Sequence, residues 1–188
     1  MERRELLKMI TLATGGVLIG GELLLSGCKT NNKSEIFFSE DDISFLDEVA
    51  ETIIPKTNTP GAKDVEVGKF MTVMVTDCYE AKDQKIFHEG LIKLEDACKK
   101  KFNSSFMKIS DDQRKEFLIE LDKEAKAYQK TKKETEQNHY FIMMKQLTLF
   151  GFFTSKPGAT EALRYVAVPG KYEGCVPYKK GDKAWATS

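Results

Sequence analysis

The run YFIMMKQLTLFGFF (140–153) leaves few folds open to this chain, because Lys145 is its only charged residue. We predict a helix over residues 136–153. Large apolar side chains lie on all sides of this helix, and a helix of that kind is normally buried. It should therefore be the central helix of a domain or be covered by a partner. Met and aromatic residues at this spacing indicate a core rather than a cofactor site.

Two capping signals mark the starts of other helices. Ser39 is followed three residues later by Asp42, and Ser110 is followed three residues later by Gln113. In a capping box these side chains satisfy the first backbone N–H groups of a helix. The helix after Ser39 should stop before Pro55, because proline disfavours helical backbone in the residue that precedes it.

Apolar residues at helical spacing predict two more helices, over 65–79 and 84–102, after a turn-rich loop at 56–63. We expect these two helices to form an antiparallel pair with a short turn near 81–83. The fold class is therefore predicted as all-α, a bundle of about five helices.

From residue 154 onward the character of the sequence changes. The segment 154–188 contains three prolines and four glycines, and its aromatic residues are Tyr165, Tyr172, Tyr178 and Trp185. Proline and glycine prevent a continuous helix here. We predict an extended tail rich in Pro, Gly and aromatic residues, laid over another surface.

The N-terminal residues have the pattern of an export signal. Arg3, Arg4 and Lys8 form a basic patch, and the uncharged run 9–21 is too short to span a membrane. Arg3 and Arg4 resemble the twin-arginine export motif. The sequence LSGC, which ends at Cys28, resembles a bacterial lipobox, in which the cysteine thiol receives a diacylglycerol.

These patterns divide the chain into three parts. Residues 1–27 are predicted to be a twin-arginine-type lipoprotein signal peptide that is removed, which leaves Cys28 as the lipidated first residue. Residues 28–35 are expected to be a flexible tether and 36–188 a helical domain. The protein is then exported to the bacterial cell envelope and anchored by lipid, facing the periplasm, on the inner or the outer membrane. The alternative is that LSGC ends an ordinary apolar helix by chance.

The net charge limits the kinds of partner, and the cysteine count limits the number of disulfides. The 29 basic and 29 acidic residues give a formal net charge of zero, so no nucleic-acid partner is expected. Besides Cys28 the chain has Cys78, Cys98 and Cys175, an odd number that allows at most one internal disulfide. The predicted helix pair separates Cys78 from Cys98, so Cys175 is expected to pair with one of these two or to stay free.

The sequence shows no pattern for catalysis. It has no Gly-rich phosphate loop, no G-x-S-x-G motif and no His/Cys/carboxylate cluster at metal-ligand spacing. His88 and His139 are isolated and are expected to be solvated or packed helix residues. We therefore predict no catalytic, cofactor-binding or metal-binding residues in this chain.

Three stretches carry a resemblance to a known family: LDEVAETIIPKTNTPGA (46–62), LTLFGFFTSKPGATEALRYVAVPGKYEGC (147–175) and the closing KAWA (183–186). In these residues the chain resembles the gluconate 2-dehydrogenase subunit 3 family, over roughly 37–185. The resemblance implies a non-catalytic small subunit of a periplasmic sugar or sugar-acid dehydrogenase.

The resemblance also implies the partners. The large subunit would be an FAD-dependent oxidoreductase of the glucose-methanol-choline (GMC) type, which holds the FAD and often lacks its own export signal. The small subunit would then carry it through the twin-arginine route, and a cytochrome c subunit is a further partner that the resemblance allows. A lipobox departs from the family pattern and implies attachment of the complex by lipid.

We expect the most informative positions to lie in the tail, where they contact the large subunit or brace the segment that does. These candidate residues are Thr154, Ser155, Gly158, Tyr165, Pro169, Gly170, Tyr172 and Gly174. One alternative is a tail that packs only on its own helices. The alternative function is a stand-alone lipid-anchored envelope lipoprotein that binds a glycan or another envelope protein.

Overall fold

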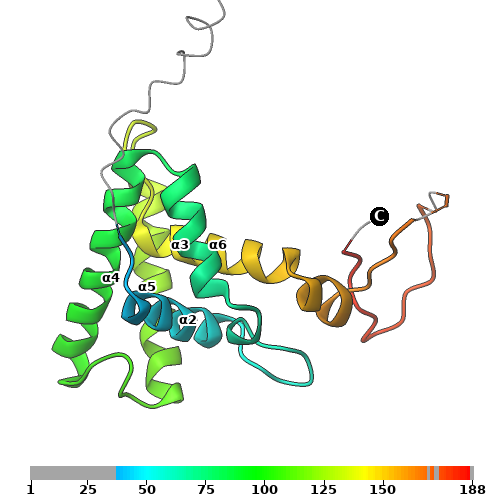
Figure 1. Ribbon diagram of the computed structural model, residues 1–188, viewed down its shortest axis with the longest axis horizontal. Helices are drawn as coiled ribbons and strands as arrows, with labels where there is room; N and C mark the ends of the chain where they lie inside the picture. Colours follow the sequence, from blue (N-terminus) through cyan, green and yellow to red (C-terminus); the bar gives the residue numbers. More distant parts are fainter. Residues whose placement is uncertain (1–36, 169, 172–173, 187–188) are drawn as a thin grey trace, which may run out of the picture. The chain divides into compact units, whose positions relative to one another are not determined.

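The computed structural model describes residues 37–168, 170–171 and 174–186, and within them the chain is helical (Figure 1). The predicted signal peptide (1–27) and tether (28–35) lie outside the described residues. The elements are α2 (Glu40–Ile53), η1 (Lys63–Val65), α3 (Val67–Cys78), α4 (Ala81–Phe102), α5 (Asp111–Thr131), α6 (Tyr140–Thr154) and the π-helical turn η2 (Gly158–Ala162). The described part contains no strand, only a single β-bridge between Arg164 and Trp185. The predicted all-α class is confirmed.

Both predicted capping boxes are present. The Ser39 hydroxyl accepts the backbone N–H of Asp42 at 3.2 Å, and the Asp42 carboxylate accepts that of Ser39 at 2.9 Å. Ser110 and Gln113 make the same reciprocal pair at the start of α5. Each box satisfies N–H groups that a helix start otherwise leaves unpaired.

The loop predicted over 56–63 is held by one carboxylate of α2. The Glu51 side chain accepts the backbone N–H of Lys56 at 2.8 Å and that of Lys63 at 2.9 Å. The ends of the loop are thereby fixed next to α2, which ends before Pro55 as predicted.

The turn between α3 and α4 is shorter than predicted. Residues 81–83 belong to α4, and Gln84, which was expected near the start of that helix, is buried. Its side-chain amide donates to the carbonyls of Thr76 and Tyr79, at 2.9 and 3.1 Å. These two bonds fasten the end of α3 to α4 and stabilise the short connection between the helices.

Helix α3 packs mainly against α2 and α6 rather than against α4, in contrast to the expected antiparallel pair. Gly68 explains the close approach to α2. Its N–H donates to the Asp47 carboxylate at 2.7 Å, and a Cβ at this position would lie 2.6 Å from the carbonyl oxygen of Ile43. Any side chain at position 68 would therefore force the two helices apart.

Helix α6 begins at Tyr140, four residues later than predicted, because a turn precedes it. The backbone N–H of Glu136 donates to the carbonyl of Lys133, and the Glu136 carboxylate accepts the Lys133 N–H at 2.9 Å. His139 then caps the helix: its Nδ1 accepts the N–H of Phe141 at 3.2 Å.

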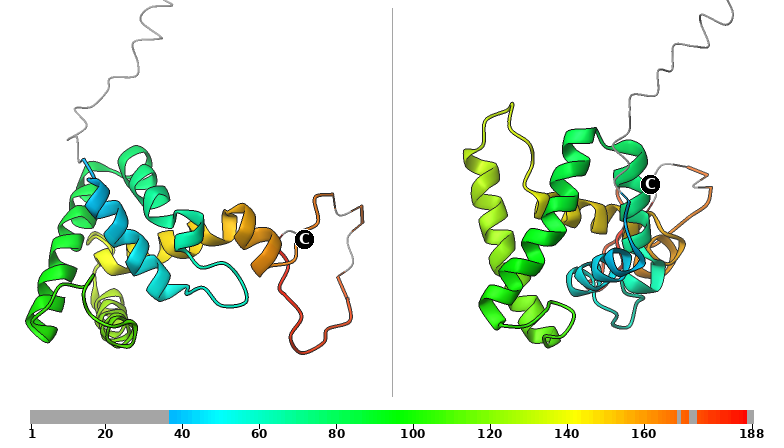
Figure 2. Two further views of the ribbon diagram at one scale, coloured as in Figure 1. Left: turned by 60° about the horizontal axis from the view of Figure 1, so that its bottom comes forward. Right: turned by 60° about the vertical axis from the view of Figure 1, so that its left-hand side comes forward.

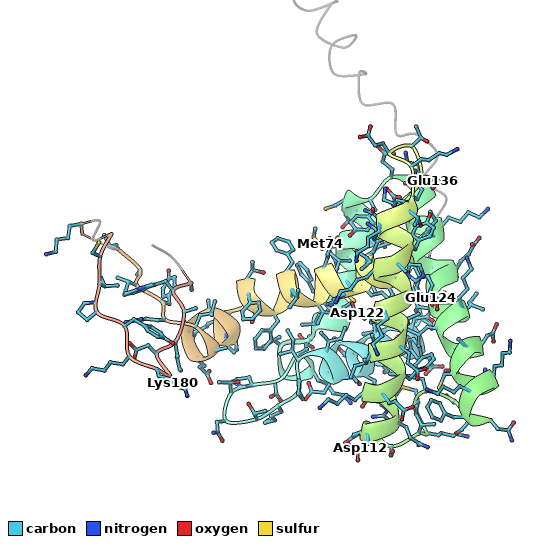
Figure 3. All side chains as sticks on the ribbon, turned by 180° about the vertical axis from the view of Figure 1, so that it is seen from behind. Met74, Asp112, Asp122, Glu124, Glu136 and Lys180 are labelled. Carbon is cyan, nitrogen blue, oxygen red and sulfur yellow. The ribbon has the colours of Figure 1, made fainter. Side chains whose placement is uncertain are left out.

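Of the two positions expected for α6, central helix or helix covered by a partner, the described chain shows the central one, since α6 contacts each of the other four α-helices. Its first three turns bury Phe141, Met144 and Leu147 in the core. Two views in Figure 2 show α6 running between the other helices and continuing towards η2. The Asp122 carboxylate of α5, labelled in Figure 3, binds Lys145 of α6 at 2.7 Å. Among the described helices none is both long and apolar enough to cross a membrane.

Candidate partner interface

The last two turns of α6 leave large apolar side chains in contact with solvent. Leu149 is 40% exposed, Phe150 is 51% exposed and Phe153 is 40% exposed. Phe70 of α3 packs against Phe150 with the ring centroids 5.6 Å apart. We call these four residues the α6 patch. It follows directly from an apolar sequence on all sides of α6, because the neighbouring helices cover only the first part of that helix.

A glycine sets the geometry of the α6 patch. Gly151 is buried, and a Cβ there would lie 2.6 Å from a ring carbon of Phe70. The missing side chain leaves room for the Phe70 ring against α6. The α6 patch is thus a continuous apolar surface contributed by two helices.

The connection from α6 into the tail is tightly braced. Thr154 donates its hydroxyl to the carbonyl of Phe150 at 2.6 Å, and Ser155 donates its hydroxyl to that of Phe152 at 2.6 Å. The Ser155 oxygen also accepts the N–H of Gly158 at 3.1 Å. Gly158 is buried, and a Cβ there would lie 1.9 Å from the Phe152 carbonyl oxygen. Only glycine fits at that point.

The tail forms a loop that closes on itself. Arg164 and Trp185 are paired through their backbones, and we call residues 165–184, between them, the C-terminal loop. Its side chains are largely exposed, among them Val168 at 82% and Tyr178 at 76%. The described aromatic residues of the tail are therefore not buried on the helices of this chain. In Figure 3 the label Lys180 marks this loop.

The structure separates the predicted candidates into two groups. Thr154, Ser155 and Gly158 brace the end of α6, whereas the candidates that face solvent lie on the C-terminal loop. Those exposed positions are Tyr165, Gly170 and Gly174. Pro169 and Tyr172 lie outside the described residues.

Sequence reasoning missed four residues that shape this surface. Besides Phe70 and Phe153 of the α6 patch, these four are Leu149, Phe150, Arg164 and Trp185, none of which was among the candidates. The apolar run in α6 did indicate that a partner covers part of the helix, but its lack of periodicity gave no means of choosing the exposed face. No local sequence pattern predicts that Arg164 pairs with Trp185.

The three described cysteines are free thiols. Cys98 is buried and its sulfur lies 3.7 Å from the carbonyl oxygen of Ser104; burial raises the pKa of this thiol. Cys78 and Cys175 are exposed. The pairing of Cys175 with Cys78 or Cys98 stays a prediction.

Ion pairs and hydrogen bonds around Glu48 and Arg114 hold neighbouring elements of the described chain together. Arg114 binds Glu48 and donates to the carbonyls of Phe106 and Met107 at 3.0 and 2.9 Å. Lys63 binds the other oxygen of Glu48 at 2.6 Å, and this hydrogen bond raises the pKa of Lys63. The described residues contain no group of three or more His, Cys, Asp or Glu side chains arranged to hold a metal ion.

An uncovered apolar face on a helical body is typical of proteins that bind another protein. The family model for gluconate 2-dehydrogenase subunit 3 matches residues 40–170, and the chain belongs to this family. The match begins at the first residue of α2 and ends within the C-terminal loop. The family identifies an accessory subunit of a dehydrogenase complex. No curated protein and no solved structure matches the chain.

Proposed function

We propose that this chain is the non-catalytic small subunit of a periplasmic FAD-dependent dehydrogenase of the GMC type, which oxidises a sugar or a sugar acid. Family membership supports the association with a dehydrogenase complex. The observation that carries the docking role is the α6 patch, three of whose side chains are at least 40% exposed and follow one another at the end of one helix. FAD and the reacting groups belong to the partner in this proposal.

The α6 patch has the composition of a protein-binding centre. Fully burying a Phe or Leu side chain is worth about 1.5–3 kcal/mol, and a few aromatic anchors usually supply most of the binding energy of an interface. Phe150 and Phe153 are such anchors, with Leu149 beside them. Covering them would remove an aggregation hazard from the isolated chain and stabilise the large subunit at the same time.

The direct test is co-expression with a GMC-type FAD-dependent dehydrogenase chain of the same organism, which we expect to be encoded next to this one. We expect the two chains to elute together in size-exclusion chromatography, with flavin absorbance in the shared peak. Elution of this chain as a stable monomer that binds an envelope glycan, away from the flavoprotein, would favour the alternative of a stand-alone binding lipoprotein. Turnover by the purified chain alone would contradict the non-catalytic role.

Export is proposed to depend on Arg3 and Arg4. The twin-arginine route moves folded proteins, so a cofactor-loaded large subunit that lacks a signal would cross the membrane as a passenger. Replacing both arginines by lysine should leave both chains in the cytoplasm, which cell fractionation and immunoblotting would detect. Normal export of the large subunit in that variant would contradict the passenger role.

Attachment to the membrane is proposed to depend on Cys28. A diacylglyceryl group supplies the two acyl chains that stable anchoring needs. The Cys28→Ser variant should release the complex from the membrane fraction. Retention there would point instead to another anchor, such as a membrane-bound cytochrome c subunit that binds the complex.

A further inference from the structure

The C-terminal loop is closed by a clasp made of Arg164 and Trp185. The Arg164 N–H donates to the carbonyl of Ala184 at 2.8 Å, and the N–H of Ala186 donates to the Arg164 carbonyl at 2.8 Å. The Arg164 guanidinium lies 4.1 Å from the centre of the Trp185 ring, well within the range of a cation–π contact. Its Nη2 also donates to the carbonyl of Lys183 at 3.1 Å.

The clasp is tied to the helical body through η2. Lys183, next to the clasp in sequence, donates its ammonium group to the carbonyl of Glu161 in η2. The turn η2 is itself fixed to the end of α6 by Ser155 and the buried Gly158. The start and end of the C-terminal loop therefore have a defined position beside α6, and the left view of Figure 2 shows the two arms of the loop converging near η2.

We propose that the Arg164–Trp185 clasp holds the C-terminal loop in the shape in which it binds the catalytic subunit. The surface that the loop binds on that subunit is an apolar patch with an acidic rim. This inference rests on the proposed function. Closing a loop before binding removes part of the ordering cost that a free tail would meet at the interface, and so tightens binding without a new contact. The side chains that such a loop offers include Tyr165, Val168 and Tyr178, which are all exposed.

The charge of the tail indicates the charge of the partner surface around the apolar contact. Residues 163–188 contain five basic and two acidic side chains, although the whole chain is neutral. Four of these basic residues, Lys171, Lys179, Lys180 and Lys183, belong to the C-terminal loop together with both acidic ones, so the loop carries a net positive charge. A complementary partner surface is apolar at its centre and negative at its rim, which also speeds association.

A protein surface fits the C-terminal loop better than a lipid surface. A lipid surface offers no fixed arrangement of acceptors and apolar pockets for a loop of defined shape. A protein partner does. In addition, a bilayer has no fixed shape to match, so a clasp that fixes loop geometry gives an advantage only with a partner of defined shape.

One donor of the clasp lacks an acceptor. The Nε of Arg164 is buried and has no hydrogen-bond partner within the described chain. A buried donor without an acceptor is destabilising, and folded proteins rarely retain one. A carbonyl or carboxylate of the catalytic subunit that reached this donor would strengthen the clasp on docking. Docking and clasp closure would then favour each other.

The test compares Trp185→Ala with Trp185→Phe in the full chain. The alanine variant should lose the clasp, whereas phenylalanine keeps an aromatic face for Arg164. In the isolated chain, trypsin should cleave at Lys179 and Lys180 faster in Trp185→Ala, while the thermal unfolding of the helical body stays unchanged. In the complex with the co-expressed flavoprotein, Trp185→Ala should dissociate about tenfold faster than wild type, and Trp185→Phe should stay close to wild type.

Each outcome has a separate meaning. If the wild-type chain does not bind the flavoprotein, the proposed function fails and the docking role of the clasp fails with it. If the wild type binds and Trp185→Ala dissociates at the same rate, only the clasp proposal is overturned. A Lys179→Glu/Lys180→Glu variant should also weaken the complex, most strongly at low salt. Loss of binding to phosphatidylglycerol vesicles in this variant, with the protein complex unaffected, would assign the loop to a membrane instead.

Discussion

At the scale of single residues, Glu48 and Arg114 connect distant parts of the described chain. Glu48 of α2 binds Arg114 of α5 and Lys63 of η1, and the Arg114 side chain is only 11% exposed. Arg114 also packs over the Phe106 ring at 5.7 Å. A buried charge of this kind is satisfied only as long as every partner is present.

Replacing Arg114 by alanine should therefore lower the free energy of unfolding by about 3–5 kcal/mol, because Glu48 keeps a buried charge with one partner fewer. Urea unfolding followed by circular dichroism measures this loss. The control is Glu116→Ala, which removes an exposed partner of Lys101 and should cost less than about 1 kcal/mol. Equal losses in the two variants would contradict the assignment of Arg114 as a buried structural cation.

His139 makes stability depend on pH. Burial lowers the pKa of His139 below its ordinary value of 6.5; Glu124 opposes this shift and Lys93 adds to it. The neutral ring accepts the N–H of Phe141, and a proton on Nδ1 would abolish that bond. Since the folded state holds the proton less tightly than the unfolded chain, the stabilisation is complete above pH 6.5 and is lost as the pH falls below it.

We expect the free energy of unfolding to fall between pH 7 and pH 5 through this residue. The variant His139→Asn keeps a side-chain acceptor for the helix start but does not titrate. Its stability should therefore lack this part of the pH dependence, as measured by urea unfolding at several pH values. Parallel profiles for the two proteins would show that His139 is not the titrating group.

At the scale of elements, the junction between α6 and η2 fixes where the helical body ends and the tail begins. The helix starts in this chain are local devices, since Ser39 and Ser110 bond to residues only three positions away. The end of α6 differs, because Gly158 must approach the backbone of Phe152 so closely that no side chain fits between them.

Gly158→Ala should consequently distort η2 and lower the free energy of unfolding by about 1–3 kcal/mol, the usual cost of inserting a methyl group into a packed site. Gly170→Ala is a matched control, because a Cβ at position 170 meets no atom within 4 Å. Thermal unfolding of the two variants gives the comparison. A Gly158→Ala protein as stable as the control would mean that η2 adjusts without loss.

At the scale of the whole molecule, the central question is which surface the fold leaves for a partner. Helices α2 to α5 bury the first part of α6 and leave the α6 patch exposed, and the C-terminal loop adds further apolar side chains. Family membership places this chain in a dehydrogenase complex. The partner, its FAD, the export route and the lipid anchor stay predictions.

Phe150→Glu should weaken the complex with the flavoprotein by about 2 kcal/mol or more, as expected for a charged group placed in the apolar centre of an interface. It should also increase the solubility of the isolated chain. Ile92→Glu is the control: Ile92 is 56% exposed but lies on α4, away from the α6 patch. Isothermal titration calorimetry measures both affinities. A larger loss with Ile92→Glu would move the interface to α4.

The sequence alone was sufficient for the helical class, the two capping boxes, the stop before Pro55 and the family, because each of these depends on neighbouring residues or on continuous stretches of chain. Tertiary structure decided the remainder. An apolar pattern on all sides of α6 has no periodicity, so only the extent of α2 to α5 determines that Phe150 and Phe153 stay exposed. The pairing of Arg164 with Trp185 likewise joins residues that no local pattern connects, and it forms only because the folded tail brings them together.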